Sequence, residues 1–113
     1  MSRTAVVTGL GFITSIGNDR AAVTDSLRTL RPGLARIDFV ESAAMPVKVA
    51  GTIKDFMVES ASWRDWRYPS RYVLPRETLR SLAPHGVYAI SAVEQALGDS
   101  QLDPTMLTDG DLK

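Results

Sequence analysis

The sequence predicts a protein of the α/β class, and three features of its 113 residues carry that prediction. A short, valine-rich apolar run near the N-terminus is typical of a buried strand. A glycine-rich loop and an amphipathic helix follow it, and a longer helical pattern begins after residue 75. Two short alternating segments between the helices favour a hairpin.

The first predicted unit is a strand, a loop and a helix. The apolar run covers 4–8, and 9–17 is a loop of small residues. Asn18 or Asp19 can accept a hydrogen bond from a free backbone amide, which predicts a helix start there. One apolar stripe is formed at spacings of four and three by Val23, Leu27 and Leu30. Pro32-Gly33 ends this helix.

The second predicted unit is a hairpin followed by an irregular segment. Apolar and charged side chains alternate in 34–40 and, more clearly, in 47–53, so the two segments could pair through a turn at 42–46. From Met57 to Pro75 no period is sustained, although tryptophans and tyrosines lie among arginines and prolines. We expect a loop or a short irregular helix there.

The third predicted unit is a long helix from Arg76 to Leu97. Its apolar face is formed by Val87, Ile90, Val93 and Leu97, whereas Ser91, Glu94 and Gln95 lie towards the polar side. Proline removes a backbone donor and clashes with the preceding turn. Pro84 therefore predicts either a kink or a short helix followed by a second helix, with Gly98 close to the end. Residues 99–113 are polar and rich in turn signals.

The composition excludes several classes of protein. Thirteen basic residues balance thirteen acidic ones, so no field of one sign favours nucleic acid or an anionic membrane. No segment approaches the roughly 18 apolar residues of a membrane span, and no signal-peptide pattern opens the chain. Zero cysteines and one histidine exclude thiolate and multi-histidine metal sites within these residues. We expect a cytoplasmic protein without a nucleic-acid partner or a membrane span.

The glycine-rich loop does not satisfy a dinucleotide fingerprint. Gly9 and Gly11 meet the first two demands of that pattern, but Thr14 stands where its third glycine belongs. The helix begins only near Asn18, so its N-terminus would not point at phosphates held by the glycines. Asp38 follows a weakly strand-like segment and is a poor ribose ligand. We expect Gly9, Gly11 and Gly17 to be structural glycines that allow a neighbouring backbone to approach closely.

Four stretches, in this order, resemble one known family. They are VVTGLG at 6–11 with Gly17-Asn18, LRPG at 30–33, VAGTIKDF at 49–56 and ALGDSQLD at 96–103. Together they are similar to the opening of the β-ketoacyl-acyl-carrier-protein synthases, the decarboxylating condensing enzymes of the thiolase superfamily. The resemblance spans nearly the whole chain, is weakest at 57–75, and points to the chain-elongating kind.

The resemblance implies a layered αβαβα fold, of which 1–113 would supply a central strand, the first helix, a hairpin and the long cover helix. This family carries a cysteine nucleophile and two histidines further along the chain. It uses no organic cofactor and works as a homodimer. It joins an acyl group on cysteine to a malonyl group on carrier protein, in fatty-acid or polyketide synthesis. With no cysteine and only His85, this chain would be an incomplete N-terminal segment, inactive alone.

Two arginines match basic positions that the elongating synthases use against the acidic carrier protein. Arg76 and Arg80 lie four residues apart and hence on one helix face. Glu77 and Ser81 stand where those enzymes often have lysine, so the match is incomplete. Carrier docking by Arg76 and Arg80 competes with the simpler interpretation that they belong to a solvated polar face.

Two other classes of function remain open from the residues alone. The first is a small nucleotide-binding α/β module, and the second is a stand-alone interaction domain. An aromatic and basic group could stack bases, although packing beneath a long loop explains it more simply; its members are Trp63, Arg64, Trp66, Arg67, Tyr68, Arg71 and Tyr72. His85 is expected on a helix surface without a catalytic role.

Overall fold

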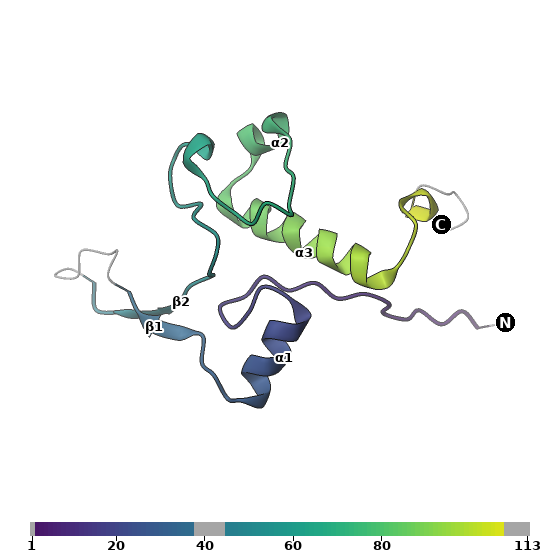
Figure 1. Ribbon diagram of the computed structural model, residues 1–113, viewed down its shortest axis with the longest axis horizontal. Coiled ribbons are helices and arrows are strands. Elements are labelled where there is room, and N and C mark those ends of the chain that lie inside the picture. The colour runs from purple at the N-terminus through teal and green to yellow at the C-terminus, as the bar shows by residue number, and fades with distance from the viewer. Residues whose placement is uncertain (1, 38–44, 108–113) are drawn as a thin grey trace.

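The computed structural model describes residues 2–37 and 45–107 (Figure 1). Its elements, in chain order, are α1 (Arg20–Arg28), β1 (Leu34–Arg36), β2 (Val49–Gly51), the 3-10 helix η1 (Trp63–Asp65), α2 (Arg76–Ser81), α3 (Pro84–Ser100) and the 3-10 helix η2 (Pro104–Leu107). The predicted mixture of helices with a small sheet is therefore confirmed. The predicted turn signals at 109–111 lie outside the described residues, as does most of the turn at 42–46.

The predicted central strand at 4–8 is wrong for this chain. These residues belong to no strand, and the side chains of Val6 and Val7 are 75% and 81% exposed. A strand needs a neighbour to satisfy its backbone groups, and none of the described residues pairs with this segment. The apolar run is present, but the surface that would bury it is not.

Helix α1 begins where its capping residue predicts. The Asp19 side chain accepts a hydrogen bond from the Ala22 amide at 2.8 Å, which decides between the two candidate caps. Val23 is buried, but Leu27 is exposed and Leu30 lies beyond the helix with a φ of 54°, so the predicted apolar stripe is buried only at its start. Ser26 is buried instead, because its hydroxyl donates to the Ile16 carbonyl at 2.6 Å.

The predicted hairpin forms; β2 is shorter than the expected segment 47–53, and 38–40 of the other expected segment lie outside the described residues. β1 and β2 pair antiparallel with Ala35 opposite Ala50, and the Ile37 amide extends the pairing by donating to the Lys48 carbonyl at 3.0 Å. This two-stranded ribbon is largely exposed, and it projects from the rest of the described chain (Figure 1).

Pro84 divides the helical region into two helices, which confirms the second of the two predicted outcomes. It occupies the first position of α3, where its missing N–H costs nothing. α2 and α3 are separated at Leu82 and Ala83. Gly98 lies close to the end of α3, as predicted, since the helix ends at Ser100 and is capped by Gln101 with a φ of 57°.

The core lies between α2, α3 and the segment that shows no sequence period. Its buried members are Phe56, Val58, Trp66, Tyr72, Leu74, Leu79 and Val87. Phe56 contacts the Tyr88 ring edge-on with centroids 5.4 Å apart, and the Trp66 indole donates to the Ser60 carbonyl at 2.7 Å. Burial, and secondarily the charge of Glu59, raises the pKa of Tyr88. The packing interpretation of the aromatic group is thereby confirmed for Trp66 and Tyr72, which are buried.

The N-terminal segment lies along α3 (Figure 1). A Cβ added at Gly9 would collide with the Ala96 carbonyl oxygen, and one at Gly11 would collide with that of Ala92. Both glycines therefore serve close backbone approach, as predicted. Beside them, the Leu10 amide donates to Asp99 Oδ2 at 3.0 Å.

The described chain is more extended than a closed domain of its length. Its Cα radius of gyration is 17.7 Å, whereas a compact domain of this size has about 13 Å. Its extents are 61 × 39 × 25 Å, and apolar side chains such as Val6, Val7 and Val93 remain exposed. Apolar surface left uncovered in this way is typical of a segment that packs against further protein.

We predict that Gly11→Ala detaches the N-terminal segment from α3. The added methyl group meets the Ala92 carbonyl, a backbone atom that cannot rotate away, and overpacking of this kind costs about 1–3 kcal/mol. Amide hydrogen exchange at Leu10 and Phe12, measured by NMR, should accelerate roughly tenfold or more.

Gly98→Ala is the matched control. A Cβ there has no heavy atom within 4 Å, so the same substitution inside α3 should stabilise the helix by about 0.5–1 kcal/mol. Equal effects of the two substitutions on Leu10 and Phe12 exchange would contradict the close-approach role.

Candidate functional site

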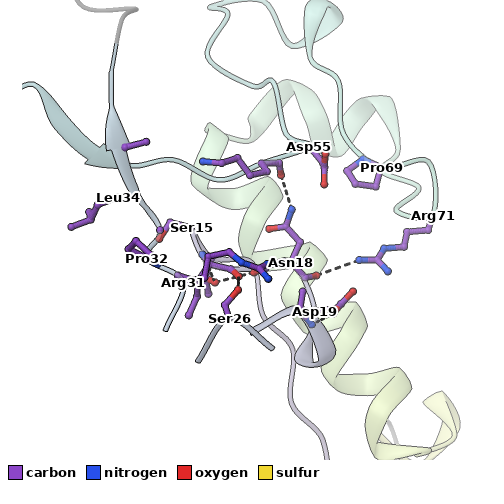
Figure 2. Close-up of a pocket in the computed structure, with 17 residues that line it drawn as sticks. Ser15, Asn18, Asp19, Ser26, Arg31, Pro32, Leu34, Asp55, Pro69 and Arg71 are labelled. Carbon is purple, nitrogen blue, oxygen red and sulfur yellow. Dashed lines mark hydrogen bonds between the residues drawn. The ribbon is translucent and has the colours of Figure 1, made fainter. Parts of the chain in front are cut away.

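A hollow lies beside the loop that follows the N-terminal segment (Figure 2). It has a volume of about 580 Å³, and α1, the hairpin and the loop that carries Asp55 line it. Its floor is a tight turn in which the Thr14 and Gly17 amides each donate to the other's carbonyl, at 3.0 and 3.3 Å. A Cβ at Gly17 would lie 2.7 Å from the Val23 amide nitrogen, so this third glycine is also structural.

Asn18 links this turn to two distant segments. Its side-chain amide donates to the Lys54 carbonyl at 2.6 Å, and its own carbonyl accepts from Arg71 Nη2 at 3.3 Å (Figure 2). Its Oδ1 atom is buried and has no hydrogen-bond partner among the described residues.

Gln95 on α3 forms three side-chain hydrogen bonds that hold the loop beside this hollow. Its Oε1 accepts from the Phe12 amide at 3.0 Å, and its Nε2 donates to the Asn18 carbonyl and the Tyr72 hydroxyl, each at 2.6 Å. One carboxamide therefore joins the N-terminal segment, the loop and the aromatic core.

The sequence interpretation missed Gln95 because it placed this residue on the polar side of the helix. Ser91 was placed there too, yet it is completely buried. The missed signal is the row at spacings of four that starts at buried Val87 and continues through Ser91, Gln95 and Asp99. Gln95 and Asp99, the last two members of that row, accept hydrogen bonds from the N-terminal segment.

The geometry of the loop argues against phosphate binding. Its amides at Leu10, Phe12, Thr14 and Gly17 donate to protein acceptors. The start of α1 carries the Asp19 carboxylate, which would repel an anion. The nucleotide-binding alternative therefore has no site in this loop.

Several charged groups that line the hollow bond within the chain. Arg31 forms an ion pair with Asp25 at 2.9 Å, and Arg71 donates to the Asn18 carbonyl. Away from the hollow, Arg20 forms an ion pair with Asp99 at 3.0 Å. Lys54 Nζ donates to the Thr52 carbonyl and hydroxyl. Among the residues that the structure describes, no group of three or more candidate ligands could hold a metal ion.

The predicted docking arginines lie on α2, apart from this hollow. Arg76 and Arg80 are exposed, and neither forms a hydrogen bond or an ion pair with any described residue. Arg76 also lines a second, smaller hollow with Trp63 and Arg64. His85 is exposed in the first turn of α3, as predicted for a surface histidine. Within the described ranges, none of the helices is long and apolar enough to cross a membrane.

The described chain mixes helices with a small two-stranded sheet, and its glycine-rich loop donates backbone amides to acceptors of its own chain. No protein-family model matches the chain. It is, however, 30% identical over 100 residues to 3-oxoacyl-[acyl-carrier-protein] synthase 1 of Escherichia coli K12, and 27% identical over 109 residues to the chloroplastic synthase II of Arabidopsis thaliana. Synthase 2 of Staphylococcus aureus is 26% identical over 102 residues.

These matches confirm the predicted resemblance to the β-ketoacyl-acyl-carrier-protein synthases. They cover 88%, 96% and 90% of this chain but only 21%, 18% and 22% of the respective relatives. The chain therefore spans about a fifth of the length of the curated relatives that it matches.

We predict that Gln95→Met weakens the fold while leaving its volume almost unchanged. The Phe12 amide loses its acceptor, whereas the Asn18 carbonyl keeps only its longer bond from Arg71 Nη2 at 3.3 Å. A buried group left unsatisfied costs about 1–3 kcal/mol, so the free energy of unfolding in urea should fall by about 1–3 kcal/mol. Exposed Glu94→Met, one position earlier on α3, should change it by less than about 0.5 kcal/mol; a similar loss in both would contradict the linking role.

Proposed function

We propose that 1–113 is the N-terminal segment of a 3-oxoacyl-acyl-carrier-protein synthase. The single observation that carries this is the 30% identity over 100 residues to an enzyme of that name, in a match covering 88% of this chain. The complete protein would be an acyltransferase that condenses a cysteine-bound acyl group with malonyl-carrier protein and releases carbon dioxide. Fatty-acid synthesis is the pathway that the relatives' names favour, and polyketide synthesis is the second candidate.

The segment contributes scaffold and not chemistry in this proposal. It contains no cysteine to form an acyl thioester, and its one histidine is exposed and pairs with no acidic side chain that the structure describes. The nucleophile and the groups that stabilise the condensation intermediate come from the remainder of the synthase, which works without an organic cofactor as a cytoplasmic homodimer.

The exposed apolar run at 4–8 supports this role. In the complete protein it becomes a central strand of the thiolase-like layered fold, because neighbouring strands supply the backbone partners that this chain lacks. The expanded radius of gyration and the uncovered valines also count against a stand-alone interaction domain, which would bury its own core.

Arg76 and Arg80 would dock the acidic carrier protein. Both are exposed, both lack an intramolecular partner among the described residues, and their spacing on α2 puts them on one face. Unpaired arginines lose no internal ion pair when they meet carboxylates of a partner, and such complementary charge mainly speeds association.

The direct test is to assay the complete protein that carries this segment with an acyl thioester and malonyl-carrier protein. Mass spectrometry should detect a 3-oxoacyl-carrier product, and the 113-residue chain alone should form none. A complete protein that forms no such product and binds NAD(P)H would overturn the proposal.

Arg80→Glu should weaken carrier binding by the complete protein by about tenfold at low salt, since it replaces an attraction with a repulsion. Isothermal titration calorimetry at two salt concentrations measures this, and the salt dependence of the affinity should also decrease. Arg28→Glu, on the distant helix α1, makes the same charge change and should leave the affinity within twofold (Figure 1). An unchanged affinity and salt dependence for Arg80→Glu would exclude the docking role.

A further inference from the structure

A second hollow, of about 310 Å³, lies between η1 and the start of α2. Trp63, Arg64 and Arg76 line it. The Arg64 guanidinium lies over the Trp63 ring, 5.1 Å from its centroid, and this cation–π contact orients the guanidinium against the indole face. Trp63 is only half-buried, so part of its indole faces the hollow.

Both cations of this hollow are available to a ligand. The Arg64 and Arg76 side chains form no ion pair and donate no hydrogen bond within the described part of the chain. The nearest acidic residues in sequence do not neutralise them. Asp65 accepts the Ser60 hydroxyl at 3.1 Å, and Glu77 forms no ion pair with either arginine.

We propose that the hollow formed by Trp63, Arg64 and Arg76 binds one carboxylate side chain of the acidic carrier protein. This inference rests on the proposed function and deepens it: it adds Trp63 and Arg64 to the docking surface and assigns them an acidic side chain as ligand. The sequence resemblance supplies Arg76 but neither Trp63 nor Arg64, which lie in 57–75, where it is weakest.

The chemistry of the three side chains favours a carboxylate with a methylene stem. Guanidinium groups bind carboxylates through two parallel hydrogen bonds, and two of them flank the hollow. The Trp63 indole, which also lines the hollow, offers an apolar surface for the stem of a glutamate or aspartate and would exclude water from one side of the ion pair. An ion pair that is partly shielded from water is worth more than an exposed one.

The position of Arg76 joins this hollow to the proposed docking face. Arg76 lines the hollow and also lies four residues before Arg80 on α2. The surface thus runs from Arg64 across Trp63 and Arg76 to Arg80. An acidic helix of the carrier could place successive carboxylates along this line, at the i and i+4 spacing that helices provide.

The test monitors the ¹⁹F NMR resonance of Trp63 in the complete protein that carries this segment. With 5-fluorotryptophan incorporated, the ¹⁹F resonance of Trp63 is assigned by its loss in Trp63→Phe. Addition of acyl carrier protein should shift that resonance, while the resonance of Trp66, which is buried and bonded to Ser60, should stay unchanged. Calorimetry should show affinity for the carrier about fivefold weaker in Arg64→Gln and in Trp63→Ala, and within twofold of wild type in Trp63→Phe.

The outcomes separate this inference from the proposed function. Weaker binding in Arg80→Glu together with unchanged binding in Arg64→Gln and Trp63→Ala would overturn the hollow as a contact and leave the docking proposal intact. A Trp63 shift produced by inorganic phosphate but not by the carrier would identify an adventitious anion only and would also overturn it.

Arg28→Gln, which removes one exposed arginine from α1, is the matched control and should have no effect on affinity. If the complete protein makes the 3-oxoacyl product but binds the carrier equally well in all these variants, the inference fails while the enzymatic proposal stands.

Discussion

The structure depends on a match in spacing between an extended chain and a helix. Gly9 and Gly11 contact Ala96 and Ala92, and the amides beside them bond to Asp99 and Gln95. Two residues of extended chain advance about 6.6 Å, and four residues of helix advance about 6 Å. Every second residue of the N-terminal segment therefore meets every fourth residue of α3, with the two running in opposite directions. Glycine permits this approach because any side chain would strike a helix carbonyl.

The same match in spacing explains where the N-terminal segment stops packing against α3. Gly9 already lies against Ser100, the last residue of α3, so 4–8 extends past the helix and its valines are exposed. At the other end, Gln95 donates hydrogen bonds to the Asn18 carbonyl and the Tyr72 hydroxyl, which connect α3 to the loop and to the aromatic core. The ion pair between Arg20 and Asp99 connects α1 to the face of α3 that carries Gln95 and Asp99. Removing Gln95 and Asp99 would break the hydrogen bonds of α3 to Phe12, Leu10 and Asn18 and the ion pair with Arg20.

The two surfaces with functional proposals lie on opposite sides of this arrangement. The exposed apolar run offers unpaired backbone to a larger sheet, whereas α2 and η1 present arginines without internal partners. Both proposals follow from groups that the chain leaves unsatisfied. The rigid aromatic packing of Phe56, Trp66 and Tyr72 beneath α2 holds the basic surface in place.

The sequence by itself determined the features that depend on local chemistry. It placed the start of α1 at Asn18 or Asp19 and a break in the helical region at Pro84, because capping and proline geometry act within one turn. The structure then chose Asp19 as the cap and two separate helices instead of a kink. The four ordered motifs also identified the synthase resemblance, which the comparisons confirmed. Only the tertiary structure decided that 4–8 remains unpaired, that Gln95 faces inwards, and that Trp63 and Arg64 share a hollow with Arg76. These depend on contacts between segments distant in the chain, and local propensity carries no information about which neighbour is present.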